Sequence, residues 1–265
     1  MFVVLRSFFD AGNKADSRAY DVLSLAVASG TANEWGPFER DWREMLQRHR
    51  ADYLHTTDAV SRKNHYTGWT EKQADSFLRD SARIVSKHFI RMKTEQDPGQ
   101  FGLYCFVFSI NLKDFVSHAQ ANTDAIKDAN EGCFRHAIAD VMEWSRDEAA
   151  ACDEIQCFFD QGEPFYGFLV NLLASERAKR DSWLLNKITS RTETDGRSTP
   201  ALQMADMFAW VQSHKHDPWN PEWKKTILRL PYRWQWLDNS NIHNVNHVHQ
   251  AMWKTWKIPK RAATK

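Results

Sequence analysis

Three aspartates stand where burial alone does not explain an acidic side chain. Asp10 ends the apolar run VVLRSFFD, Asp160 ends the run IQCFFD, and Asp206 interrupts the apolar segment PALQMADMFAW. A carboxylate out of water is unfavourable unless it is paired or metal-bound, and neighbouring carboxylates repel unless a cation or proton separates them. We therefore expect the three to converge on Mg²⁺ or Mn²⁺, which prefer oxygen ligands. Two such ions can activate a water and stabilise the leaving oxygen in phosphodiester cleavage.

Three further residues could take part in this chemistry. His55 and Asp58 are three residues apart in DYLHTTD (52–58), which we expect to be a short strand, and they could supply a general acid or a further ligand. Glu163 follows Asp160 by three residues and could replace a missing carboxylate. The predicted catalytic residues are Asp10, Asp160, Asp206, His55 and Asp58, and the predicted metal ligands are Asp10, Asp160, Asp206 and Glu163.

Each candidate also has a structural interpretation. Asp10 and Asp160 each precede a glycine by two residues, and both could simply begin turns. Asp206 lies three residues after Gln203, so the pair could form an exposed stripe on a helix. Asp58 could cap a helix beside a surface histidine, and Glu163 could be a solvated acid.

Histidines near the C-terminus raise the alternative of a zinc-dependent hydrolase, because imidazole suits that ion. The spacing of these histidines does not form a zinc signature, and no nearby carboxylate or cysteine completes a ligand set. We therefore regard polar loops as the simpler interpretation of His214, His216, His243, His247 and His249.

The composition is that of a folded globular protein. Hydrophobic residues make up 42% and charged residues 26% of the 265, which excludes collagen-like, low-complexity and wholly disordered classes. The net charge of +1 gives no overall electrostatic field that would indicate a nucleic-acid or membrane partner. The N-terminus lacks the features of a signal peptide, no apolar run is long enough to span a membrane, and the four cysteines show no disulfide framework, so we expect a cytoplasmic protein.

The elements that must position the candidates begin with a β-hairpin and then alternate between strands and helices. The hairpin is expected from the apolar runs at 3–12 and 20–29. Further strands are expected at 101–110, 153–160 and 188–194, the last as an edge strand. Apolar residues at helical spacing predict helices at 35–50, 70–89 (with Thr70 as N-cap), 131–150, 165–180 and 200–216. This order favours a mixed sheet flanked by helices, an α/β arrangement.

The last fifth of the chain differs in composition. Beyond residue 211, ten basic residues face three acidic ones, so this part carries +7 and the rest −6, and it holds six of the twelve tryptophans. We predict a domain at 1–215 and a helical, Trp-rich extension at 216–265 packed on it. The extension could guide a nucleic-acid strand by charge and stacking, and its aromatic residues are also a candidate homodimer interface.

Taken together, FFDAG, LHTTD, FFDQGE and PALQMADMFAW resemble, in this order and over about residues 5 to 215, an uncharacterised family known as domain of unknown function 3800. The most specific part is Gln203 with Asp206. That family is similar in predicted organisation to ribonuclease H-like nucleases and transposases, whose first strand carries an Asp and whose later strand and C-terminal helix supply further carboxylates. The resemblance implies that Asp10, Asp160 and Asp206 are the corresponding positions.

Two functions follow from this resemblance. The first is a Mg²⁺- or Mn²⁺-dependent nuclease acting on nucleic acid, in a ribonuclease H-like α/β domain. The second is an inactive relative of that fold that binds nucleic acid or protein. It is favoured because the family's first strand continues Asp-Glu-Ser-Gly, whereas this chain has Asp10, Ala11 and Gly12.

Overall fold

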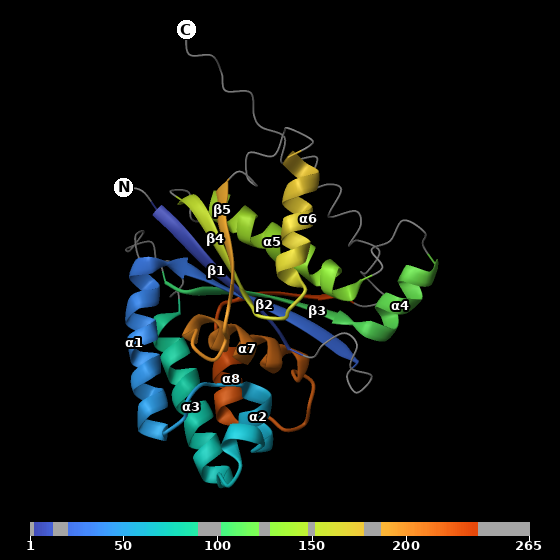
Figure 1. Ribbon diagram of the computed structural model, residues 1–265. Helices are drawn as coiled ribbons and strands as arrows, with labels where there is room; N and C mark the ends of the chain where they lie inside the picture. The colour runs from blue at the N-terminus through green and yellow to red at the C-terminus, as the bar shows by residue number, and fades with distance from the viewer. Residues whose placement is uncertain are drawn as a thin grey trace.

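The computed structural model describes residues 3–12, 21–89, 102–121, 128–147, 152–177 and 187–237. In these ranges a six-stranded mixed sheet is flanked by helices, as the alternation of elements predicted (Figure 1). The strands are β1 (Val3–Gly12), β2 (Val22–Thr31), β3 (Tyr104–Asn111), β4 (Cys152–Asp160), β5 (Ile188–Thr194) and β6 (Arg233–Leu237). The helices are α1 (Ala32–His49), α2 (Thr56–Ser61), α3 (Glu71–His88), α4 (Leu112–Ala121), α5 (Ala129–Asp147), α6 (Phe165–Arg177), α7 (Pro200–Ser213) and α8 (Glu222–Leu228), with a 3-10 turn at Asn64–Tyr66.

The strand order is β5-β4-β1-β2-β3-β6. The hairpin prediction is confirmed, because β1 and β2 pair antiparallel, and β3 extends this pairing on β2. On its other side β1 pairs parallel with β4, which pairs parallel with β5, so these three strands end at the same edge of the sheet. β5 is an edge strand, as its polar alternation predicted.

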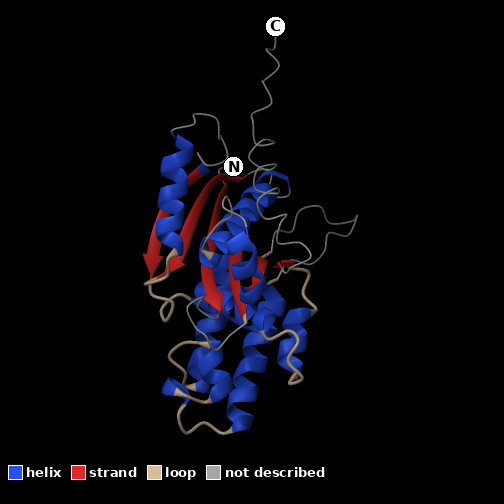
Figure 2. Ribbon diagram, turned by 90° about the vertical axis from the view of Figure 1, so that its right-hand side faces the viewer, coloured by secondary structure: helices blue, strands red, loops and turns tan. Residues whose placement is uncertain are grey.

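Side chains alternate between the two faces of the sheet, as in any strand. On β1, Leu5 and Phe9 pack into one core, and Phe8 packs into the other. The first core lies against α5 and α6, and the second lies against α1, α3, α7 and α8, so helices cover both faces (Figures 1 and 2). Asp10 follows Phe8 by two residues and therefore faces the same side as α7.

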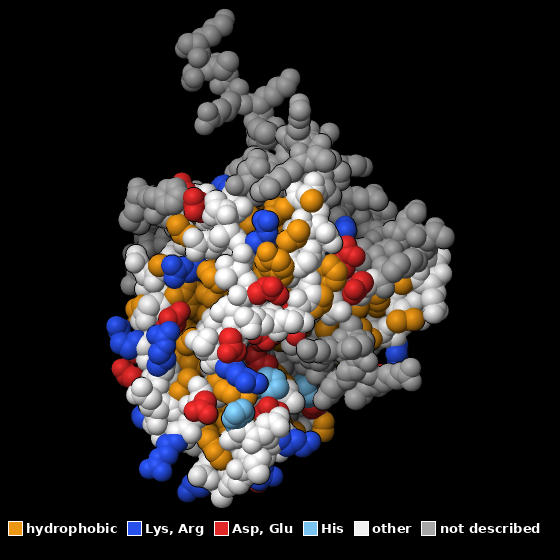
Figure 3. Space-filling model, viewed as in Figure 1, with side chains coloured by type: hydrophobic (Ala, Val, Ile, Leu, Met, Phe, Trp, Pro, Cys, Tyr) orange, Lys and Arg blue, Asp and Glu red, His pale blue; other side chains and the backbone are white. Residues whose placement is uncertain are grey.

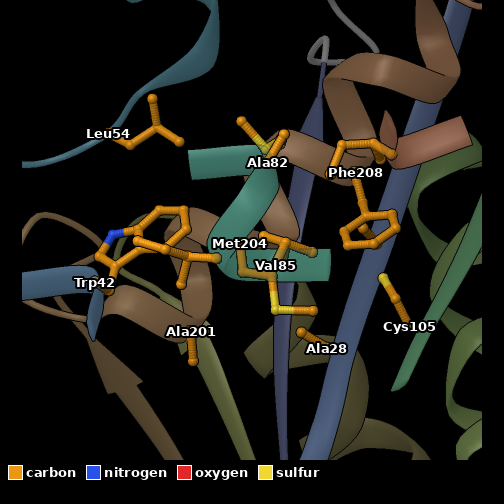
Figure 4. Packing of buried hydrophobic residues seen from close by; sticks show 14 of the residues in the cluster. Ala28, Trp42, Leu54, Ala82, Val85, Cys105, Ala201, Met204 and Phe208 are labelled. Carbon is orange, nitrogen blue, oxygen red and sulfur yellow. The ribbon is translucent and has the colours of Figure 1, made fainter. Parts of the chain in front are cut away.

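Helix α7 lies unusually close to the sheet because β1 ends in a glycine. A Cβ added at Gly12 would lie 3.0 Å from the backbone carbon of Ala209, so any larger residue would push the helix away. Met204 on this helix packs near Ala28 of β2, together with side chains from α1 and α3 (Figure 4). The close contact between β1 and α7 brings Asp206 to the face that carries Asp10.

Two local predictions are wrong. Residues 52–58 are not a strand: the chain runs irregularly to His55 and then enters α2. Hydrogen bonds to side chains hold the backbone groups of 53–55, which leaves no strand partner. The extension is not purely helical either, since 233–237 form β6, which pairs parallel with β3. Helix α4 was not anticipated.

The predicted helix at 70–89 is confirmed with its cap. The hydroxyl of Thr70 accepts the backbone N–H of Gln73, and the Gln73 side chain accepts the N–H of Thr70. All four cysteines are free and buried. In the described part of the chain, no helix is both long and apolar enough to cross a membrane.

Candidate functional site

Asp10 and Asp160 lie on neighbouring parallel strands. The register pairs Phe8 with Phe158 and Phe9 with Phe159, and both aromatic pairs stack, with ring centroids 4.6 and 4.8 Å apart. The next residue on each strand is the aspartate, so the two acids follow the stacked pairs at the carboxyl ends of β1 and β4. In open α/β sheets this edge is where ligands bind.

Asp160 is held by the loop that follows β5. Its Oδ1 accepts the backbone N–H of Gly196 at 2.8 Å. The chain then turns sharply, since Gly162 has a φ of 84°, a value that favours glycine, and the N–H of Glu163 donates to the carbonyl of Asp160 at 3.3 Å. The turn predicted at 160–162 is therefore present, and it leaves the carboxylate of Asp160 on the cleft.

Asp206 reaches the same place from α7. Its side chain is buried at 7% exposure, and its Oδ2 accepts the backbone N–H of Thr56, the first residue of α2, at 2.6 Å. Gln203 is also buried, at 3% exposure. The alternative of an exposed Gln203 and Asp206 stripe is therefore wrong.

The Gln203 amide joins three separate segments. Its Oε1 accepts the indole N–H of Trp42 at 2.8 Å and the backbone N–H of Leu54 at 2.9 Å. Its Nε2 donates to the carbonyls of Gly196 at 3.0 Å and Arg197 at 2.9 Å. Because Gly196 in turn binds Asp160, Gln203 positions the loop that positions this carboxylate.

These segments enclose one cleft of about 700 Å³. In Figure 3, acidic, histidine and basic side chains lie together over this region, below the ends of β4 and β5. The cleft brings together five of the six predicted site residues. Its lining includes Asp10, His55, Asp58, Asp160, Asp206, Tyr53, His65, Asp195, Arg197 and Gln203.

The surroundings of Asp10 disfavour the charged form of its carboxyl group. Loss of solvent raises its pKa well above the usual value, and the charges of Asp206, Asp160 and Glu163 raise it further. Burial also raises the pKa of Asp206, although His55 and hydrogen bonding from Thr56 oppose this change. The acids are thus near enough to repel one another, and a positive charge among them would relieve the repulsion.

His55 and Asp58 form a pair on the cleft wall. The imidazole Nδ1 of His55 lies 3.0 Å from Asp58 Oδ2, and the two side chains are 48% and 13% exposed. Glu163, the sixth predicted residue, lies beyond the turn after β4 and acts on Asp10 through its charge.

Tyr53 and Arg197 line the cleft, although the sequence analysis did not predict them as site residues. They lie on two loops far apart in the chain, and the Arg197 guanidinium stands 5.6 Å from the centre of the Tyr53 ring. Neither stands in an apolar run, the pattern that drew attention to the aspartates. Only their contact across the cleft marks them.

The donor chemistry of the cleft suits Mg²⁺ or Mn²⁺, because its acids offer hard oxygen ligands. Within the described ranges, however, no group of three or more His, Cys, Asp or Glu side chains is arranged to hold a metal ion. The three aspartates share one cleft without forming a ready ligand cluster. Of the histidines considered for zinc, His214 and His216 lie after α7, whereas His243, His247 and His249 lie outside the described residues.

Comparison with known proteins adds no assignment. No family model matches the chain, and neither a curated protein nor a solved structure matches it. The resemblance to domain of unknown function 3800 therefore stays a prediction from the motifs.

Proposed function

We propose that this chain is a nuclease that hydrolyses phosphodiester bonds of nucleic acid with Mg²⁺ or Mn²⁺ held by Asp10, Asp160 and Asp206. One observation carries the proposal: three acids from β1, β4 and α7 border one cleft, where burial first, and then the charges of Asp206 and Asp160, raise the pKa of Asp10. Placing like charges together is unfavourable for the fold, and a bound cation offsets this repulsion.

The hydrogen bonds of the cleft are compatible with this use of the carboxylates. Asp160 and Asp206 each have one oxygen held by a backbone N–H, from Gly196 and Thr56. A cation at this site would take its oxygen ligands from these carboxylates.

A divalent ion held by Asp10, Asp160 and Asp206 would supply Lewis-acid chemistry, lowering the pKa of a water and offsetting charge on the leaving oxygen. Hydrolysis adds the water oxygen to phosphorus, breaks a P–O bond and leaves an alkoxide that needs a proton. Among the described residues that line the cleft, His55 is the group that we assign to exchange that proton. Asp58 holds its Nδ1, which leaves Nε2 to give up or accept a proton.

We further infer that the α/β fold is ribonuclease H-like. The support is the distribution of the acids: the first strand and a later, adjacent strand each carry an Asp near the carboxyl end, and a C-terminal helix packed on the first strand carries the third. This is the distribution that the resemblance implies. Four free cysteines suit a reducing compartment, so the proposed setting is the cytoplasm.

A second candidate is a metal-free binding protein with the same fold. It is favoured by Ala11, which stands where the resembling family has Glu. The backbone hydrogen bonds to Asp160 and Asp206 also favour it, because they stabilise both carboxylates without an ion.

Calorimetric titration with Mg²⁺ and Mn²⁺ distinguishes the two candidates. Wild type should bind saturably, and Asp160→Asn should weaken binding by about tenfold or more, since it removes a charged ligand while its amide oxygen still accepts the Gly196 N–H. The matched control is Asp75→Asn on α3, which removes one charge outside the cleft and should bind like wild type.

The same three proteins should then be assayed for cleavage of labelled RNA and DNA. We expect cleavage by wild type and Asp75→Asn, and a loss of about 100-fold or more in Asp160→Asn. Wild type that binds neither ion, with or without an oligonucleotide, and cleaves nothing would overturn the nuclease proposal in favour of the binding protein.

A further inference from the structure

The lining of the cleft includes a pair of side chains that the proposed hydrolysis does not use. Tyr53 is half-buried, and its ring faces the exposed guanidinium of Arg197 at 5.6 Å. The ring of His65 meets Tyr53 edge-on, with centroids 4.9 Å apart and planes at 70°. All three line the same cleft as the acids.

The backbone beneath Tyr53 is fixed at three successive residues. The buried hydroxyl of Tyr66 donates to the carbonyl of Tyr53 at 2.5 Å and accepts the N–H of His55 at 3.3 Å. Between them, the N–H of Leu54 donates to Gln203 at 2.9 Å. The Tyr53 ring therefore stands on a rigid support, as a stacking platform requires.

The backbone of Arg197 is also fixed, while its side chain is available. Its carbonyl accepts from Gln203, and its N–H donates to Asp195 Oδ1 at 2.9 Å. Among the described residues, none forms an ion pair with its guanidinium. It is the one Lys or Arg among the described residues that line the cleft, against five aspartates.

A small shift of the Arg197 side chain would make room for a planar guest between it and the Tyr53 ring. The guanidinium carbon lies 5.6 Å from the ring centre, whereas a base between two planes needs about 7 Å, twice a stacking distance of about 3.5 Å. An exposed Arg side chain can shift by this difference, or it can turn to the phosphate that follows the base. Stacking on an aromatic ring and an Arg contact to phosphate are two recurring contacts to unpaired nucleotides.

We propose that Tyr53 and Arg197 form a nucleotide clamp that selects single-stranded nucleic acid, an inference that rests on the proposed nuclease function. An unpaired base stacks on Tyr53, Arg197 pairs with the adjoining phosphate, and the next phosphodiester is directed toward the aspartates. A base inside a duplex has both faces covered by its neighbours, so a duplex offers the clamp nothing to stack.

The test measures binding without cleavage. Fluorescence anisotropy in EDTA compares short labelled single-stranded RNA and DNA with the same sequences as duplexes. Wild type should bind single strands at least about tenfold more tightly than duplexes. Tyr53→Ala should weaken binding by about 5- to 150-fold, the range for loss of one base–aromatic stack, whereas Tyr53→Phe keeps the ring and should bind like wild type.

The contribution of Arg197 is read from salt dependence. Arg197→Ala should weaken binding and reduce the slope of log affinity against log salt by about 0.7, the value for one phosphate contact on a single strand. Arg83→Ala removes an exposed arginine on α3, outside the cleft, and should leave both quantities unchanged.

The clamp and the nuclease fail in distinguishable ways. Wild type that binds no oligonucleotide, duplexes that bind as tightly as single strands, or Tyr53→Ala that binds like wild type would each overturn the clamp. The cleavage assay with Asp160→Asn decides the nuclease separately. Tyr53-dependent binding without cleavage by wild type would leave the clamp standing on a binding protein.

Discussion

The carboxylate of Asp160 owes its position to a residue without a side chain. Gly196 donates its N–H to Asp160 Oδ1, and a Cβ added at Gly196 would lie 2.9 Å from that same oxygen. Atoms do not approach this closely without one of them moving. A methyl group at this position therefore requires the Asp160 carboxylate to move.

Gly196→Ala should displace the Asp160 carboxylate while the protein stays folded. We expect Mg²⁺ or Mn²⁺ affinity, measured by calorimetry, to fall by about tenfold, the effect of disturbing a group that orients a ligand. Gly167→Ala is the matched control, because its Cβ meets nothing within 4 Å and it lies in α6. That variant should keep its affinity and gain about 0.5–1 kcal/mol in free energy of unfolding. Unaltered affinity in Gly196→Ala would show that the loop does not position the carboxylate.

At the scale of single residues, the sequence predicted the acidic residues of the cleft better than the residues that position and surround them. Asp10, Asp160 and Asp206 could be found because each interrupts an apolar run, and the structure brings all three to one cleft with His55 and Asp58. Gly196, Tyr53 and Arg197 could not be found this way, because their roles depend on distances between loops. Gln203 was noticed as part of a motif, but its four hydrogen bonds involve three segments that no local pattern connects.

Among the elements, β6 is tied to α5 by an unusual ion pair. Arg233 begins β6, and its guanidinium lies 3.3 Å from both Asp140 and Glu143 of α5. Asp140 is 4% exposed, and its Oδ2 is buried without a hydrogen-bond partner. Burial raises the pKa of Asp140 to about 6, although Arg233 opposes the shift.

This raised pKa predicts a pH dependence of stability with a definite sign. The folded protein holds a proton on Asp140 more tightly than the unfolded chain, so the contribution of Asp140 to stability falls as pH rises from about 4 to about 6. Asp140→Asn carries no such proton. Its free energy of unfolding relative to wild type should therefore increase over this range by up to about 3 kcal/mol, at about 1.4 kcal/mol per pKa unit.

Urea unfolding at pH 4 and pH 7 measures this difference. Glu131→Gln, on the same helix but outside the Arg233 pair, is the control and should change by the same amount as wild type between the two pH values. A constant difference between Asp140→Asn and wild type would contradict the prediction.

Helices and strands with a strong periodicity of apolar residues were predicted from the sequence. Elements that depend on pairing with residues distant in the chain were not. The buried strands and the helices at α1, α3, α5, α6 and α7 each carry a clear apolar pattern. β6 has the sequence RWQWL, whose basic and aromatic residues hid a strand that exists because it pairs with β3. Thr56 and Thr57 suggested a strand, yet α2 begins there, where the Thr56 N–H binds Asp206.

For the molecule as a whole, the basic C-terminal part joins the same core as the cleft. Trp223 of α8 is 1% exposed and packs near Trp210 of α7, with ring centroids 5.5 Å apart. Lys224 is fully buried and donates to the carbonyls of His214, at 2.5 Å, and Trp219, at 3.0 Å, close to where α7 ends. A boundary at residue 215 thus crosses packed structure.

Two tryptophan variants test whether α8 and the rest of the domain unfold together. Trp223→Ala should lower the free energy of unfolding by about 3–5 kcal/mol in a single urea transition, because it empties a core position. Trp234 is 47% exposed and lies under Lys215 at 3.5 Å, so Trp234→Ala should cost about 1 kcal/mol or less. A separate early transition in Trp223→Ala, with the main one unmoved, would indicate two independent units.

The parallel pairing of β1 with β4 affects the order in which the chain folds during its synthesis. β2 follows β1 directly, so the hairpin closes over a short stretch of chain, whereas β4 joins β1 only after α1 to α5 have been made. Closing so long a loop is slow, and chains fold from the N-terminal end as they emerge. A nascent chain therefore displays Asp10 early, but it has no complete acidic cleft until α7 has left the ribosome.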